Sequence, residues 1–240
     1  MRVPILHVMM IAVARNCKTD IKWWHSPLLK LYDSLIRSDA VRLADLIVVM
    51  AGRMERKRYG LELYRAGVAP RLVLSIGRFE VSRMRELDLE KADELIALRD
   101  RTEPGRRHFF VKMDPSGIRI ETVGLSIWNT YGEVLGLQQY LAREGARSVM
   151  VISTDVHLRR VAATFSKVFR DEPIEFLYCA VPGRLGFLRR DGWWTRPDRW
   201  FVVMELLKLA GYRVIFSTPA WAIPRLMRLR RFCGTRRIRV

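Results

Sequence analysis

A chain of 240 residues with 50% hydrophobic side chains can bury a core of its own, so we expect one large domain, with or without appendages. Its three cysteines are widely separated and form no CxxC pair, which excludes a disulfide framework and a zinc-site spacing and indicates a reducing compartment. The formal net charge of +18 predicts an anionic partner, although part of this charge belongs to the C-terminus. The last sixteen residues hold no acid and seven arginines: Arg225, Arg228, Arg230, Arg231, Arg236, Arg237 and Arg239.

The first forty residues combine an apolar run with an aromatic stretch. Val3–Ala14 is apolar apart from His7; it loosely resembles a signal peptide and is too short to span a bilayer as a helix. We favour a protein that is cytoplasmic or peripherally associated with the inner membrane over an exported one. Residues 23–32 predict a helix packed on the domain, with a helix lying at a membrane surface as the alternative. We assign residues 1–40 to a separate N-terminal segment.

The next stretch predicts a strand–helix–strand unit. Ala44–Gly52 and Arg71–Gly77 have the composition of buried strands, and Arg53–Ala66 has that of the connecting helix. Gly52 and Gly77, at the two strand ends, would let the backbone approach a ligand closely. Neither the dinucleotide fingerprint GxGxxG nor the P-loop motif occurs, so we expect neither a conventional NAD enzyme nor a P-loop ATPase.

The middle of the chain is more polar. Residues 80–105 predict one or two solvent-facing helices. Residues 109–113 and 117–123 predict two strands, which we interpret as a hairpin. Thr130–Glu133 fits a capping box, which would start a helix that runs to about Glu144.

The stretch Ser148–Arg160 is the one around which we expect the chain to be organised. Its apolar first half predicts a strand buried on both faces, as in parallel sheets, and Ser153 and Thr154 stand at the carboxyl end of this strand. Ligands of open α/β sheets bind at such ends. On the following helix His157 and Arg160 would share one face near its start. The alternative interpretation is an ordinary N-cap followed by a surface histidine and a surface arginine.

The C-terminal part predicts a long helix and a basic tail. Pro197–Ala210 is an amphipathic helix whose apolar face is interrupted by Glu205, which we expect to point to a basic partner in the core or pocket. We assign residues 41–215 to one α/β domain and residues 216–240 to a basic, aromatic tail. The tail could lie on an anionic membrane surface, and a disordered basic tail is the alternative. Nucleic-acid binding is disfavoured.

Several motifs recur in the order and spacing of a known family. They are Asp45–Gly52 with Arg53, Leu63–Pro70 and Leu72–Ser75; Glu121 with Ser126, Asn129, Thr130 and Glu133; Ser153–Arg160; and Trp193, Trp194, Glu205 and Tyr212. Over roughly residues 41–215 the chain therefore resembles the YdcF-like family, the group of YdcF, SanA and ElyC. It departs from the family at Ala51–Gly52, where Gly-Gly is usual, and at Ser75–Gly77, where Ser-Gly-Gly is usual.

The resemblance implies a Rossmann-like, three-layer α/β/α fold with a mainly parallel sheet and a polar, partly basic pocket at the strand carboxyl ends. It also implies a role in bacterial envelope biogenesis. Binding of a nucleotide-like ligand such as S-adenosylmethionine is attributed to some relatives, so S-adenosylmethionine is the cofactor that the resemblance suggests.

From the residues themselves we expect the pocket to pair a catalytic carboxylate, Glu121, with His157 as acid and base. The alternative for Glu121 is a hydrogen bond to a neighbouring loop or cap. We expect no metal site, because no tight cluster of histidines and carboxylates occurs. Arg53 and Arg160 would hold phosphate or carboxylate oxygens. The ligand-binding candidates are Gly52, Arg53, Ser75, Gly77, Ser126, Asn129, Thr130, Ser153, Thr154 and Arg160.

The function predicted from the sequence is the binding of a small anionic ligand, nucleotide-like or a lipid-linked phosphate. Transferase or hydrolase chemistry is compatible with this function, but the residues do not establish that the protein is an enzyme. The alternative is a non-catalytic, membrane-associated envelope factor that binds a lipid-carrier intermediate or a protein partner. Neither the substrate nor the reaction follows from the residues.

Overall fold

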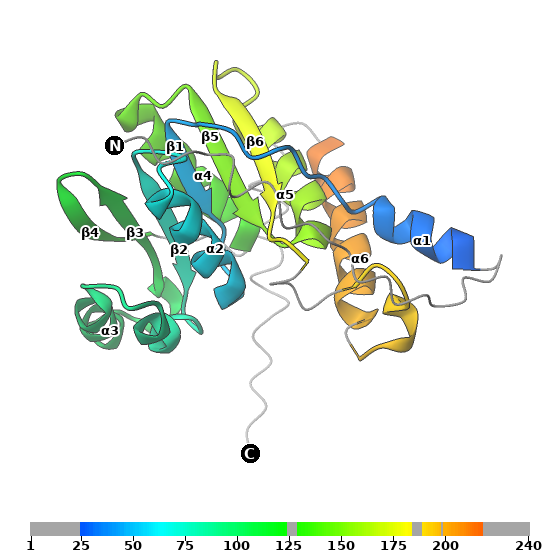
Figure 1. The fold of residues 1–240 in the computed structure, drawn as a ribbon, viewed down its shortest axis with the longest axis horizontal. Coiled ribbons are helices and arrows are strands. Elements are labelled where there is room, and N and C mark those ends of the chain that lie inside the picture. The colour runs from blue at the N-terminus through cyan, green and yellow to red at the C-terminus, as the bar shows by residue number, and fades with distance from the viewer. Residues whose placement is uncertain (1–24, 124–128, 184–188, 198, 218–240) are drawn as a thin grey trace.

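A computed structural model describes residues 25–123, 129–183, 189–197 and 199–217 of the chain (Figure 1). The signal-peptide-like run, Ser126 and the arginine-rich tail lie outside these residues. One six-stranded sheet has the order β4-β3-β2-β1-β5-β6. Its strands are β1 Leu46–Val49, β2 Leu72–Gly77, β3 His108–Asp114, β4 Gly117–Thr122, β5 Ser148–Ser153 and β6 Glu175–Ala180.

The sheet is mixed and mostly parallel. β2, β1, β5 and β6 are parallel neighbours, while β3 and β4 form an antiparallel hairpin that adds to the edge of β2. The structure thus confirms an α/β fold, and it confirms the predicted hairpin. Because β1 lies between β2 and β5, the strand order reverses direction at β1, which is where open α/β sheets place their ligands.

Helices flank the sheet on both faces, and the alternation of side chains along β1 explains why. Ile47 and Val49 pack into one core with α2 and α3, whereas Leu46 and Val48 pack into a second core with α4 and α5. The helices are α1 Ser26–Asp33, α2 Met54–Arg65, α3 Ala92–Arg101, α4 Asn129–Glu144, α5 Asp155–Val168 and α6 Arg199–Ser217, with short 3-10 helices at Val81–Leu87, Pro104–Arg106 and Trp193–Thr195. Both faces of the central strands are therefore dry, as their unbroken apolar composition predicts.

A third, smaller core lies outside these layers, where α6 packs against α5 and α1 joins them (Figure 1). Tyr32 of α1 donates a hydrogen bond of 2.6 Å to the carboxylate of Asp155 at the start of α5. The indole of Trp193 donates to the Leu28 carbonyl oxygen at 3.1 Å. The helix α6 continues seven residues beyond the predicted end at Ala210, because the apolar pattern persists through Phe216.

The segment after α1 runs along the free edge of β6. The amide of Asp39 donates to the Tyr178 carbonyl oxygen at 2.6 Å, and the Tyr178 amide donates to the Asp39 carboxylate at 2.8 Å. The Ala180 amide donates to the Ser38 hydroxyl at 3.2 Å. This edge of the sheet is therefore covered by the chain's own backbone and polar side chains.

Substituting Gly60 by alanine should lower the free energy of unfolding by about 1–3 kcal/mol or more, because α2 lies very close to β1 at this position. A β-carbon on Gly60 would stand 2.3 Å from Cγ2 of Val49, inside van der Waals contact. Gly211→Ala in α6 is the matched control, since its β-carbon would meet nothing within 4 Å and alanine favours a helix. Urea denaturation should show destabilisation of the first variant and none of the second; equal stabilities would contradict the close packing.

Candidate functional site

Charged and polar side chains gather at the carboxyl ends of β1, β2 and β5, where the strand order reverses. The loop after β1 leads into α2 on one face of the sheet, and the loop after β5 leads into α5 on the other. The buried members of this group are Arg56, Lys57, Ser75, His108, Thr130, Glu133, Ser153, Thr154, His157, Arg160 and Glu205. Burial of so many polar groups requires that each find a partner, which ties the strand ends to the surrounding helices.

A lysine–glutamate pair fixes the ends of β1 and β2. The Lys57 side chain is fully buried, donates to the Met50 carbonyl oxygen at 3.2 Å and forms an ion pair with Glu80. Glu80 also accepts hydrogen bonds from the backbone amides of Gly52, at 2.6 Å, and Gly77, at 3.2 Å. Gly52 has φ +133°, a conformation that favours glycine, so this turn needs its glycine.

Arg56 and Glu133 hold the turn after β1 from opposite sides of the sheet. Arg56 donates to the Ala51 carbonyl oxygen at 2.5 Å and to the Thr154 hydroxyl at 2.9 Å, so it links the ends of β1 and β5. The Glu133 carboxylate of α4 accepts from the Ala51 amide at 2.7 Å. Burial raises the pKa of Glu133 and lowers the pKa of Arg56 to about 10, with Glu133 opposing the latter shift.

Arg160 and Glu205 form the second buried ion pair of the site and join α4, α5 and α6. The Arg160 guanidinium donates to both oxygens of Glu205, at 2.9 and 3.1 Å, and to the Thr130 hydroxyl at 2.6 Å. Lys208 adds a hydrogen bond of 3.0 Å to the same carboxylate. Burial opposes ionisation of Glu205, yet the guanidinium of Arg160 holds its pKa well below the ordinary value. The prediction that Glu205 points to a basic partner is confirmed.

The imidazole of His157 is neutral and has a defined tautomer. Burial, and then the charge of Arg160, lower its pKa to about 3. Its Nδ1 atom lies 2.7 Å from Nη2 of Arg160 and 3.2 Å from Glu205. Because a guanidinium has no acceptor, Nδ1 must accept from Arg160, and the proton is carried by Nε2. In this arrangement His157 can donate a hydrogen bond, whereas its basic nitrogen is already occupied.

A second histidine supports the end of β2. Nε2 of His108 lies 2.7 Å from the hydroxyl of Ser75, and both side chains are buried. Burial lowers the pKa of His108 to about 4, so this ring is neutral as well. The pair fastens the first residue of β3 to the adjacent strand end.

Three buried atoms of the site lack a hydrogen-bond partner among the described residues: Oε2 of Glu80, Oγ of Ser153 and Nε of Arg56. The Glu80 oxygen still forms the ion pair with Lys57, which leaves Oγ of Ser153 and Nε of Arg56. Both belong to side chains around the end of β5, since Arg56 bonds to Thr154, the residue after Ser153. A buried donor or acceptor without a partner costs about 1–3 kcal/mol. Such a cost inside an otherwise well-bonded network marks the place where an external group could bind.

Comparison of the chain with protein-family models, with curated proteins and with solved structures gave no match. The site must therefore be interpreted from its own geometry. Within the described ranges no three His, Cys, Asp or Glu side chains are grouped to hold a metal ion. Those ranges also include no helix with the length and apolar character needed to cross a bilayer.

Most of the predicted binding residues, and the predicted catalytic His157, meet at this edge of the sheet: Gly52, Ser75, Gly77, Thr130, Ser153, Thr154, His157 and Arg160. Arg53 lies at their margin, 39% exposed at its side chain, 3.6 Å from Glu55 and over the ring of Phe201. Asn129 begins α4, but its side chain and all of Ser126 lie outside the described part of the chain.

The prediction that Glu121 and His157 form an acid/base pair is wrong, because the order of the strands separates them. Glu121 stands on β4, which is four strand spacings, or about 19 Å, from β5. Its carboxylate pairs with Lys112 and, at 3.4 Å, with Arg143 of α4. Glu121 therefore has a structural role, as the alternative interpretation proposed, but its partners are side chains of a strand and a helix and not a loop or a cap.

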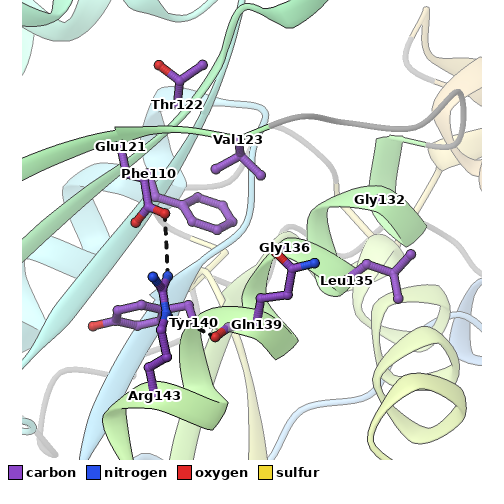
Figure 2. Close-up of a pocket in the computed structure, with 10 residues that line it drawn as sticks. All are labelled: Phe110, Glu121, Thr122, Val123, Gly132, Leu135, Gly136, Gln139, Tyr140 and Arg143. Atoms are coloured by element: carbon purple, nitrogen blue, oxygen red, sulfur yellow. Dashed lines mark hydrogen bonds and ion pairs between the residues drawn. The ribbon is translucent and has the colours of Figure 1, made fainter.

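Glu121 lines a separate hollow of about 230 Å³ between β3, β4 and α4 (Figure 2). Phe110, Val123 and Gly136 provide apolar walls, while Gln139 and Arg143 stand on the helix side of the opening (Figure 2). This hollow is distinct from the buried network at the ends of β1 and β5.

The capping box predicted at Thr130 and Glu133 is also wrong. Thr130 lies inside α4, which begins at Asn129, and its hydroxyl accepts from Arg160. Glu133 bonds to the turn after β1 instead of turning back to its own helix. Both side chains are thus used between elements, which the local S/T-x-x-E pattern does not reveal.

Five polar residues of the site escaped the sequence analysis: Arg56, Lys57, Glu80, His108 and Glu133 as a site residue. For one of them, Lys57, the sequence contains a pattern that could have predicted its burial. Lys57 follows Met54 by three residues and precedes Leu61 by four, so it occupies the apolar face of α2. A lysine on such a face indicates a buried partner. Glu80, by contrast, lies in a turn with no periodic pattern.

Proposed function

We propose that this chain is a YdcF-like protein with a Rossmann-like, three-layer fold, and that it binds a small anionic ligand at the carboxyl ends of β1 and β5. The unpaired Ser153 hydroxyl and Arg56 Nε carry this proposal. Both atoms can donate a hydrogen bond, and a phosphate or carboxylate oxygen would satisfy such donors. Their location at the reversal of strand order is the usual ligand position in open α/β sheets.

The balance of buried charge supports an anionic ligand. The cations Arg56, Lys57 and Arg160 face the acids Glu80, Glu133 and Glu205, so the network is balanced only while every acid is ionised. Burial raises the pKa of Glu133. Protonation of this one carboxyl would leave an excess of positive charge, which a bound anion would neutralise.

Ligand classes that fit this proposal are nucleotide-like molecules that carry phosphates and lipid-linked phosphates used in envelope biogenesis. S-adenosylmethionine, which the family resemblance suggests, fits less well: it offers one carboxylate, but its sulfonium and ammonium groups make it cationic overall. The occupied Nδ1 of His157 favours a binding role over general-base catalysis. A non-catalytic envelope factor is therefore our preferred form of the function, and transferase or hydrolase chemistry is the second. The proposal also includes contact between the C-terminal tail and an anionic membrane. The protein would then be cytoplasmic or peripherally associated with that membrane.

The substitution Ser153→Ala should preserve the fold and weaken binding of the ligand. Removing an unpaired buried hydroxyl should leave the stability of the free protein unchanged or raise it by up to about 1 kcal/mol. A nucleotide, S-adenosylmethionine or polyprenyl phosphate that stabilises the wild type by about 2.7 kcal/mol at a hundredfold excess over its Kd should bind about tenfold more weakly to the variant. A thermal-shift titration measures both effects.

Ser75→Ala is the matched control, because it deletes a hydroxyl that bonds to His108 at 2.7 Å. It should destabilise the free protein by about 1–3 kcal/mol. If Ser153→Ala lost stability to the same degree, its hydroxyl would have a hidden partner in the fold. If no compound stabilised the wild type, the small-ligand proposal would be abandoned.

A further inference from the structure

The outward face of α6 is apolar along most of its length. Trp200, Met204, Leu207 and Val214 are 62%, 45%, 61% and 67% exposed. Their spacing of four, three and seven residues places them on one side of the helix. The side that packs on the domain holds Val202, Glu205, Leu209 and Tyr212 instead. The helix α6 thus has two largely apolar sides: one packs on the domain, and the other is exposed.

The charges beside this face have one sign. Arg199 and Lys208 are exposed on α6 at the borders of this face, and the Arg199 guanidinium lies 6.0 Å from the centre of the Trp200 ring. The only acid of the helix, Glu205, is buried against Arg160. A partner that covers the outward face would therefore meet apolar side chains bordered by cations and no carboxylate.

We infer that this face of α6 lies on the surface of an anionic lipid bilayer. Apolar side chains would enter the boundary between headgroups and acyl chains, while arginine and lysine side chains would reach the anionic headgroups. Tryptophan, with its large amphipathic ring, is enriched at this depth. Pairing with a second copy fits less well, because the like charges of Arg199 and Lys208, which border the face, would be brought together across the interface.

The inference is independent of the small-ligand proposal, although the two sites share one helix. Glu205 points from α6 into the buried network, and Phe201 lies 6.0 Å from the Arg53 guanidinium at the margin of that network. A bilayer bound to the outward face would therefore lie on the opposite side of the helix from Glu205. Loss of lipid binding need not alter ligand binding.

Co-sedimentation of the full-length protein with vesicles tests the inference. Vesicles of phosphatidylcholine mixed with phosphatidylglycerol should bind the wild type, and vesicles of phosphatidylcholine alone should bind it more weakly. The double variant Met204→Ser/Leu207→Ser should reduce the partition coefficient for the mixed vesicles by about tenfold or more. Both side chains are exposed, so the unfolding temperature should stay that of the wild type.

Val41→Ser/Leu43→Ser is the matched control, because it removes two exposed apolar side chains from a different surface, 45% and 67% exposed. Its partition coefficient should equal that of the wild type. Equal binding of the α6 variant and the wild type would overturn the inference, as would equal binding to both kinds of vesicle. A dimer in light scattering that the α6 variant dissociates, without an effect on vesicle binding, would assign the face to a second copy instead.

Discussion

Replacing Glu205 by alanine should lower the free energy of unfolding by about 3–5 kcal/mol, because it leaves a buried guanidinium without its counter-ion. Arg160 donates two hydrogen bonds to this carboxylate and a third to the Thr130 hydroxyl. Alanine would leave the positive charge in a buried site, in contact with the neutral ring of His157. The free energy of unfolding in guanidinium chloride measures the loss.

Glu94→Ala provides the control for the same chemical change. Its carboxylate pairs with Lys91 at 3.2 Å on the surface of α3, where both side chains are largely exposed. A pair of this kind contributes at most about 1 kcal/mol. A loss of similar size for Glu205→Ala would mean that Arg160 finds other partners easily, and the proposed role of Glu205 in joining α6 to α5 would be wrong.

Acidification should destabilise the protein well above the pH range in which ordinary carboxylates titrate. Burial lowers the pKa of His157 to about 3 and that of His108 to about 4, whereas the ordinary value is 6.5. Below pH 6.5 the unfolded chain binds protons that the folded chain excludes, so stability falls as the pH falls toward the folded values. Each histidine should therefore lower the free energy of unfolding at pH 5.5 by about 1.4 kcal/mol relative to pH 7.5.

The raised pKa of Glu133 acts in the opposite direction, because the folded state takes up this proton first and gains stability as the pH falls. A comparison with His108→Gln separates the contributions. Between pH 7.5 and pH 5.5 the variant should lose about 1.4 kcal/mol less than the wild type, as measured by urea denaturation at each pH. An equal loss in both proteins would show that His108 titrates normally in the fold.

The strands and most helices follow from local patterns in the sequence. The continuous apolar runs of β1, β2 and β5 predict strands buried on both faces, and each is found within three residues of its predicted limits. Gly67 and Gly145, with φ +77° and +63°, follow the ends of α2 and α4, where a left-handed glycine commonly stops a helix. Local propensity and burial agree at these positions, so pattern alone suffices.

The site was predicted only in part, because it depends on which strands are neighbours. Ser153, His157 and Arg160 lie next to one another in the sequence, and their grouping was predictable. The position of Glu121 depends on β3 and β4 adding to the far edge of β2, which no local pattern encodes. Likewise Glu133 and Glu80 have their partners at Ala51 and Gly52, distant in sequence.

The cover on the edge of β6 has a consequence for the order in which the protein is assembled. The segment that supplies it, Ser38–Asp39, meets partners that follow by about 140 residues. Tyr32 and Leu28 likewise bond to residues that are synthesised much later, Asp155 and Trp193. During synthesis these early residues must leave the ribosome without a binding surface and stay unpaired until the last strand and α6 are made. Residues 28–39 therefore reach their contacts only after β6 and α6 have formed, and a chain that ends before β6 would leave these residues and the edge of β5 exposed.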